Sequence, residues 1–427
     1  MTLFLIFITF SICLLLNIPI VFCMALGALA GTIFEGQALG LILIPQRLVH
    51  GMDSFVLLAI PLFILAGSLM DVGGITKRLV RLARALVGHF KGSLGQIVVV
   101  SEMFFSGISG STVADVSAIS SMMIPPMRIA GYVTAYSVAI ISATSAMGIL
   151  IPPCNLMVVL GDITGVSVGA LFFAGFVPAF ILALILMSVL YYQAHKFDLP
   201  AGDRASFKEL RSAMVGSLIP LGMPVIIFGG ILGGICTPTE AAALAVVYAF
   251  IVGVFVYKEI KLHHFWKIVV DSGVTTGMVM FLVGMASIFS FQLAVQHVPE
   301  MLANLVSSIT KNPYVFLVLS NIIFIVFGAI LEGIPAAVIF VPMFMPIVTN
   351  MGIDPLHFGI LVVASIGIGV FVPPVGVGLI IACGIAQVEI KETIRYLLPL
   401  LSILFIGLIF LTFFPWFTTF VPRLFNL

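Results

Sequence analysis

The chain has 427 residues, of which 62% are hydrophobic and only 8% charged, and its formal net charge at pH 7 is +1. Apolar runs long enough to cross a bilayer recur along the whole chain, which excludes a soluble globular domain. Runs of about 18 or more apolar residues indicate helices rather than the short alternating segments of a membrane β-barrel. We therefore expect an all-α polytopic membrane protein, with lipid around it and no nucleic-acid partner.

The chain opens with an apolar stretch over residues 2–34, which is too long for one helix. Asn17 and Pro19 mark a turn there and favour two helices. The start lacks basic residues and a small-residue cleavage site, so we interpret it as a retained membrane segment. The basic amphipathic run at 75–91 predicts an interfacial arm that meets lipid headgroups. We assign 1–72 to scaffold helices and 73–92 to this arm.

The positions of the basic residues predict the topology. If the short polar intervals that hold most of them face the cytoplasm, only Arg47, Lys311 and Arg423 of the 18 Lys and Arg residues lie outside. The chain between Lys91 and Arg128 then begins and ends on the same side. We therefore expect a re-entrant hairpin there, with its tip at "SGISGS", residues 106–111.

The stretch "SAMGILIPPCN", residues 145–155, places Pro152 and Pro153 inside an apolar run. A proline has no N–H for the carbonyl four residues back, so the pair is expected to break the helix and free the carbonyls of Gly148 and Ile149. The hairpin, the broken helix and a return helix make up residues 93–195. A cytoplasmic loop follows at 196–212.

The second half repeats this plan at an offset of 221 residues. The offset places Gly107 on Gly328, Pro178 on Pro399, and the first Pro pair on Pro373 and Pro374. Glycines and prolines set backbone shape, so their recurrence predicts a structural repeat. We assign 213–298 to scaffold helices, 299–312 to an outer interfacial arm, and 313–427 to a hairpin with its tip at 328–335, a broken helix and a final helix. Because the hairpins enter from opposite sides, the architecture is an inverted-topology repeat, as in many secondary transporters.

Each Pro pair has two interpretations. In the first, the pair merely kinks a packed helix. In the second, the carbonyls that the pair frees bind a small hard cation in a protein-lined cavity. The repetition and the adjoining hairpin tip favour the second. One site would use the hydroxyls of Ser106, Ser109 and Ser111, and its counterpart would use residues 328–333 with Gly369. We expect two cation sites beside a central anionic substrate.

Five stretches in this order resemble the large membrane (M) subunit of tripartite ATP-independent periplasmic (TRAP) transporters: "SGISGSTVADVSAI", "GILIPP", "CTPTEAAALAV", "LEGIPAAVIFVPMFMPI" and "VFVPPVGVGLIIACGIAQ". The resemblance covers nearly the whole chain. It implies an elevator-type, sodium-coupled importer of organic acids in the bacterial inner membrane. It also implies two partners, a small four-helix membrane subunit and a periplasmic substrate-binding protein. Overall resemblance favours the sialic-acid branch.

The resemblance also implies residues for two Na⁺ sites. For the first sodium site the resemblance implies Ser109, Ser111, Gly148, Ile151 and Pro153. Ser106 is added to this site as a hydroxyl of the hairpin tip. The second comprises Gly328, Gly333, Gly369, Val372 and Val375. The candidates for a substrate region are Asp115, Asn155, Glu332 and Gly376. Two positions depart from the family pattern, because Val372 stands where Thr is usual and Glu332 where Asp is usual.

A carboxylate inside the membrane raises the free energy of the folded protein, so each one is a candidate for function. Asp115 fits either function or helix capping, while Glu240 after "TPT" fits an N-terminal cap. Glu102, Asp162 and Asp271 are expected to be solvated or locally paired. The five cysteines, in separate apolar stretches, are interpreted as core residues.

Two other functions remain. One is a self-sufficient carboxylate transporter of related fold. The other is an intramembrane enzyme, for which the sequence shows neither a nucleophile with a base nor an H-E-x-x-H pattern.

Overall fold

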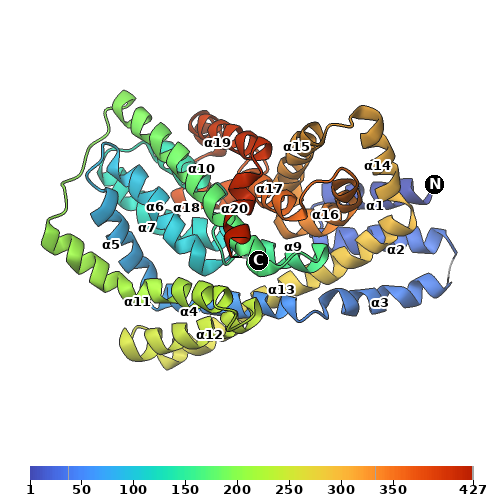
Figure 1. The fold of residues 1–427 in the computed structure, drawn as a ribbon, viewed down its shortest axis with the longest axis horizontal. Coiled ribbons are helices and arrows are strands. Elements are labelled where there is room, and N and C mark those ends of the chain that lie inside the picture. The colour runs from blue at the N-terminus through green and yellow to red at the C-terminus, as the bar shows by residue number, and fades with distance from the viewer. Residues whose placement is uncertain (37, 332, 426–427) are drawn as a thin grey trace.

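The computed structural model describes residues 1–36, 38–331 and 333–425, and within these ranges the chain forms helices and no strand (Figure 1). The first half contains α1 (Thr2–Leu15), α2 (Ile20–Phe34), α3 (Ala38–Met52), α4 (Ala59–Val72), α5 (Ile75–Val87), α6 (Ser93–Ser109), α7 (Thr112–Ile129), α8 (Thr134–Gly148), α9 (Asn155–Thr164) and α10 (Val168–Lys196). The second half contains α11 (Phe207–Leu232), α12 (Pro238–Ile251), α13 (Leu262–Val295), α14 (Val298–Ile309), α15 (Pro313–Leu331), α16 (Gly333–Asn350), α17 (Pro355–Gly369), α18 (Val377–Ala386), α19 (Ile390–Phe413) and α20 (Trp416–Leu424). Seven helices of the described part are long and apolar enough to cross a membrane, or eight if a bent pair counts as one span.

The helix boundaries recur with the offset of the sequence repeat. Helices α7 and α16 begin at residues 112 and 333, and α8 and α17 begin at 134 and 355. Helices α8 and α17 also end at equivalent positions, 148 and 369, four residues before the first proline of each Pro pair. The glycine and proline positions therefore predicted the repeat of helix boundaries correctly.

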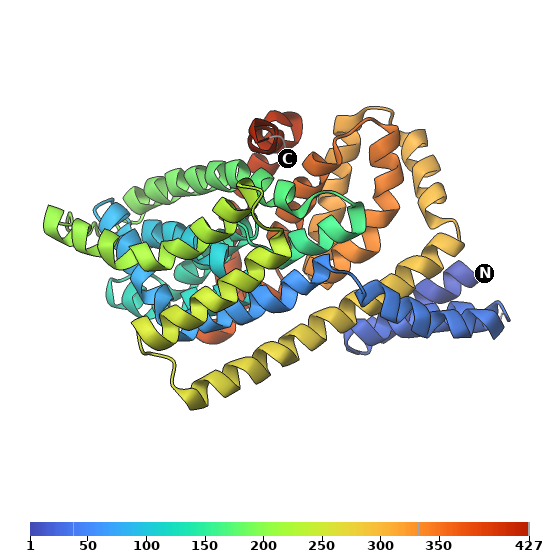
Figure 2. The same cartoon turned by 60° about the horizontal axis from the view of Figure 1, so that its bottom comes forward.

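The halves differ in one helix shape. In the first half, α3 and α4 are bent by 61° at a short break, where a 3-10 turn spans Val56–Leu58. The equivalent part of the second half is the single 34-residue helix α13, which runs obliquely across the lower part of Figure 2.

The opening stretch forms two helices, as predicted. Asn17 adopts a left-handed backbone conformation with φ of 59°, and Pro19 caps the start of α2. Proline suits this place because its missing N–H would have no acceptor at a helix start.

The basic arm is helix α5. Its apolar face, which includes Leu79, Leu82 and Ala83, is buried, while Lys77 and Arg81 are exposed. Arg78 differs from its neighbours because its guanidinium pairs with Glu259 at 3.2 Å and lies 3.5 Å from the ring centre of Tyr257.

The helices pack as two groups. Helices α1–α4 and α11–α13 pack mainly on one another, and Figure 1 shows α11 and α12 along the lower edge of the view. Helices α6–α10 and α15–α20 form the second group, which contacts the first through α13 against α16 and through α4 against α6 and α9. Within the second group α8 and α17 approach closely, since a Cβ at Gly367 would overlap the carbonyl oxygen of Ala146.

The first hairpin turn is tighter than the sequence suggested, and helix extends into the expected tip of the second. Helix α6 continues through Ser109, so the first tip consists of Gly110 and Ser111 rather than 106–111. Gly110 has φ of +65°, and this left-handed conformation ends the helix abruptly. In the second half only residue 332 separates α15 from α16, so the expected tip at 328–335 is helical on both sides.

Candidate ion and substrate sites

A cavity of about 10 Å³ lies between the first hairpin turn and the break after α8. It is lined by Ser106, Gly110, Ser111, Thr112, Asp115, Gly148, Ile149, Ile151, Pro153 and Cys154. A volume of this size holds about one water molecule or one small ion. The structure therefore brings five of the residues proposed for the first sodium site to one point. The sixth proposed residue is Ser109, whose side chain lies outside the described part of the structure.

Small residues seat the hairpin turn on the break. A Cβ at Gly107 would lie 3.2 Å from the carbonyl oxygen of Pro152, and one at Gly110 would lie 3.2 Å from that of Pro153. The N–H of Asn155, the first residue of α9, donates to the carbonyl of Gly110 at 3.3 Å. Because larger side chains would hold these segments apart, the glycines position the cavity.

One expected free carbonyl has a partner. The chain tightens after α8, and the N–H of Ile151 donates to the carbonyl of Gly148 at 2.8 Å. The expectation that Pro152 leaves this carbonyl without a backbone partner was wrong, because a turn three residues long replaces the lost helical bond. A carbonyl oxygen has two lone pairs, so Gly148 retains one for a cation.

The sequence reasoning missed the burial of Glu102. Of its two expected roles, solvated or locally paired, the first is wrong because the exposed fraction is 0%, and the second fits its contact with Ser106 four residues away. The hydroxyl of Ser106 lies 2.7 Å from Asp115 Oδ2 and 3.4 Å from Glu102 Oε1, so one serine links two buried carboxylates. The i, i+4 spacing of Glu102 and Ser106 was the available signal, since it places both on one helix face.

These carboxylates need a positive charge. No lysine or arginine is among the residues lining the adjoining cavity in the described chain. A buried carboxylate is costly unless it is neutralised by a proton or by a nearby cation. The cavity beside Ser106 is therefore suited to a small cation.

The second break has a similar close-packed frame. A Cβ at Gly328 would lie 3.1 Å from Ile366 Cα, and one at Gly333 would lie 3.3 Å from Ile366 Cγ2. The N–H of Val372 donates to the carbonyl of Gly369 at 2.9 Å. The side chain of Val375 points away, with 49% exposed. Glu332, predicted to act here, lies outside the described residues.

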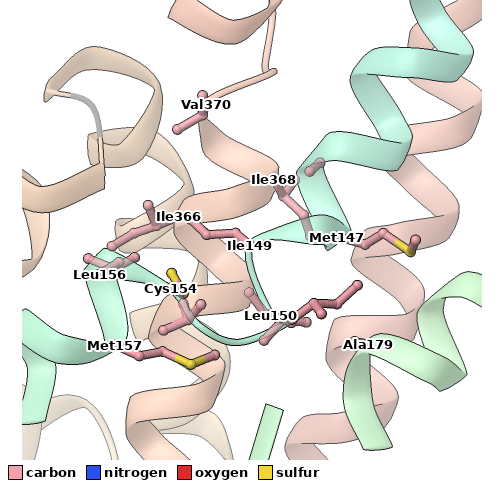
Figure 3. Close-up of a cluster of buried hydrophobic side chains, with 14 of the residues drawn as sticks. Met147, Ile149, Leu150, Cys154, Leu156, Met157, Ala179, Ile366, Ile368 and Val370 are labelled. Carbon is pink, nitrogen blue, oxygen red and sulfur yellow. The ribbon is translucent and has the colours of Figure 1, made fainter. Parts of the chain in front are cut away.

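A larger cavity of about 150 Å³ lies between the two breaks. Its walls include the first residues of α7, α9 and α16, together with Val370 from the second break, Ile64 from α4 and Thr275 from α13. Three helix N-termini thus open into it, and the positive end of a helix dipole attracts an anion. No lysine or arginine lines its described wall. Figure 3 shows apolar side chains around the first break, with Ile149 of the break and Leu156 of α9 beside Ile366 of α17.

Asn155 belongs to this cavity. Its side chain is 6% exposed, and its Oδ1 has no hydrogen-bond partner among the described residues. Gly376, the other predicted substrate residue of the described chain, caps α18 and is not among the residues that line the cavity.

Two of the remaining carboxylates have structural partners, whereas Asp271 is exposed, as expected. Glu240 forms the predicted capping box, receiving the N–H of Thr237 at 2.7 Å. Asp162 was expected to be solvated or locally paired, but it accepts a hydrogen bond from Ser54, which is distant in sequence.

Comparison with known proteins gives a consistent result. The family model described as tripartite ATP-independent periplasmic transporter, DctM component, matches residues 7–417. The chain is 39% identical to the C4-dicarboxylate TRAP transporter large permease protein DctM of Pseudomonas aeruginosa, covering 91% of each chain. It is 36% identical to the sialic acid TRAP transporter large permease protein SiaM of Vibrio cholerae, covering 96% of each. The fold resembles the crystal structure of the Alcanivorax borkumensis YdaH transporter, with a TM-score of 0.62, 15% identity and 88% of each chain covered.

Proposed function

This chain belongs to the DctM component family of tripartite ATP-independent periplasmic transporters, and from this premise we propose that it couples the inward movement of a small organic acid to sodium. It is the large permease subunit and a multi-pass protein of the inner membrane. Large permeases of this family work with a small membrane subunit and a periplasmic binding protein, and we assign both partners to this chain.

The ion-sized cavity is the observation that carries the sodium proposal. It joins hydroxyl oxygens, break carbonyls and a carboxylate, and oxygen ligands suit a small hard cation. The buried carboxyl groups of Asp115 and Glu102 add an electrostatic reason, because a cation bound beside them would stabilise their ionised form and a water molecule would not. By the repeat, a second sodium site lies at Gly328, Gly333, Gly369 and Val372, and there it would rely on carbonyl oxygens.

The larger cavity is the proposed substrate site. Helix N-termini would hold a carboxylate, and Asn155 would orient it. Relatives carry acids of very different size, and a cavity of about 150 Å³ corresponds to a benzene-sized ligand. We therefore favour a short acid of C4-dicarboxylate size over the sialic acid that overall resemblance suggested.

The two helix groups suggest how transport proceeds. The substrate cavity has walls from α7, α9 and α16 on one side and from α4 and α13 on the other, so it lies at the boundary between the groups. We propose that the two hairpins are re-entrant from opposite membrane faces and that the group holding them slides against the other as an elevator. Movement at this boundary would carry acid and sodium together.

Reconstituted transport tests the proposal. Proteoliposomes holding this chain and its small membrane subunit, supplied with the binding protein loaded with labelled succinate, should take up label only under an inward sodium gradient. Uptake driven equally by a proton gradient without sodium would overturn the coupling. Uptake that persists without both partners would identify a self-sufficient transporter. Preference for labelled sialic acid over succinate would reject the short-acid assignment alone.

A further inference from the structure

A third cavity, of about 410 Å³, lies at the junction of α5, α6 and α11, away from both candidate sites. Three arginines reach it from separate elements: Arg81 and Arg84 from α5, and Arg204 from the loop before α11. Ser93, the first residue of α6, is also in its wall and is buried. The first N–H groups of a helix have no acceptor inside the helix, so this wall adds donors to the three guanidinium groups.

The walls of this cavity are tied together. The N–H of Gly92 donates to the carbonyl of Pro200 at 3.1 Å, and Lys91 pairs with Asp198 at 2.8 Å. The hydrogen bond and charge of Lys91 lower the pKa of the Asp198 carboxyl, so this ion pair is present at neutral pH. The loop that carries Arg204 is thereby held against the start of α6.

The cavity also contains two carboxylates, which do not cancel its positive charge. Glu209 caps α11, where it accepts the N–H of Ser206 at 2.8 Å, and it keeps its negative charge there. Asp203 and Glu209 together offset two of the three arginines, which leaves one positive charge in the cavity. The remaining charge and the α6 N-terminus favour an anion with several oxygens, such as a phosphate group.

We propose that this cavity is a specific binding site for the phosphate headgroup of an anionic phospholipid. Beyond the cavity, Met214, Val215 and Leu218 of α11 are 54%, 58% and 65% exposed, which provides an apolar surface for acyl chains. The distribution of basic residues places this end of the chain at the cytoplasmic leaflet, where anionic lipids attract clustered arginines. A soluble phosphate compound would gain nothing from the apolar surface.

Lipid binding to the purified full-length chain tests the site. Delipidated protein would be titrated with phosphatidylglycerol or phosphatidylethanolamine, and bound lipid counted by native mass spectrometry. The triple variant Arg81→Gln, Arg84→Gln, Arg204→Gln should bind phosphatidylglycerol at least about tenfold more weakly than the wild type. The matched control Lys77→Gln, Lys208→Gln, Arg211→Gln removes three charges outside the cavity and should bind normally.

Three results would overturn the proposal. Equal weakening in both triple variants would mean general surface attraction. Equal affinity of the wild type for the two lipids would remove the requirement for a net negative headgroup. Full displacement of the lipid by inorganic phosphate would identify a soluble phosphate as the ligand. If the triple variant is poorly folded, Arg84→Gln and Arg204→Gln singly, compared with Lys77→Gln, make the same distinction.

Discussion

The hydroxyl of Ser106 in α6 donates a hydrogen bond to Oδ2 of Asp115 in α7 over 2.7 Å, and both residues line the ion-sized cavity. Replacing Ser106 by Ala should therefore remove an oxygen from the proposed ion site. A lost bond to a charged group costs about 1.5–3 kcal/mol, or about tenfold to a hundredfold in apparent sodium affinity. Initial uptake rates measured against sodium concentration should show this shift, with recovery at high sodium. Ser121→Ala, on the exposed face of α7, is the control, and an unchanged sodium curve for Ser106→Ala would exclude its hydroxyl as a contributor.

Glu102 gives a second test of the same site. Glu102→Gln keeps the shape of the side chain but removes its charge, so the attraction for a cation should fall. We expect the sodium concentration for half-maximal uptake to rise about tenfold or more, with little change in the affinity of the binding protein for the acid. Glu300→Gln removes an exposed charge, 65% accessible, and should leave the curve unchanged. The same sodium dependence in both variants would show that the buried charge has no part in coupling.

Gly148 should tolerate no side chain. A Cβ there would overlap the hydroxyl of Ser106 and lie 3.2 Å from Glu102 Oε1. Gly148→Ala is expected to displace Ser106 and abolish sodium-dependent uptake, while the protein still inserts in the membrane. Gly273→Ala is the matched control, because a Cβ at that helical glycine meets nothing within 4 Å. Normal uptake by Gly148→Ala, measured in protein of equal membrane content, would place the ion elsewhere.

The arginines of the basic arm should differ in their effect on stability. Arg78 donates to the carbonyl of Gly74 at 2.7 Å, pairs with Glu259 and covers Tyr257, whereas neighbouring Lys77 is exposed. Arg78→Gln should lower the free energy of unfolding by about 1–2 kcal/mol, and Lys77→Gln should change it by less than about 0.5 kcal/mol. Thermal unfolding of the solubilised variants would measure the difference. Equal melting temperatures of the two variants would show that Arg78 stabilises the fold no more than the exposed Lys77 does.

Topology can be tested with engineered cysteines at positions 204 and 311, both exposed. The positive-inside pattern predicts that position 204 reacts only from the cytoplasm and position 311 only from the periplasm. A variant without the five native cysteines is the background, and it also reports non-specific labelling. Labelling of both positions from one side would contradict the opposite orientation of the two halves.

The sequence predicted the backbone better than it predicted the placement of charges. Pro152 and Pro373 lack an N–H wherever they occur, so the positions of the breaks follow from local chemistry. The burial of Glu102 depends on α8 lying against α6, and Arg78 differs from Lys77 only because a loop of the other half reaches it. Such distinctions arise from contacts between distant segments and leave no periodic signal. The tightness of the first hairpin turn was also missed, because Gly107 ends neither helix nor turn and instead permits close packing.

The contact between Ala146 and Gly367 has a consequence of its own. These residues are 221 positions apart, so they occupy equivalent places in the two halves, and yet they touch. Two equivalent points can meet only on the axis that relates their halves. A side chain added at Gly367 would therefore push α8 and α17 apart at equivalent points of the two halves. A shift of α8 at this contact would therefore be expected to move α17, and with it the second break, because their backbones touch directly.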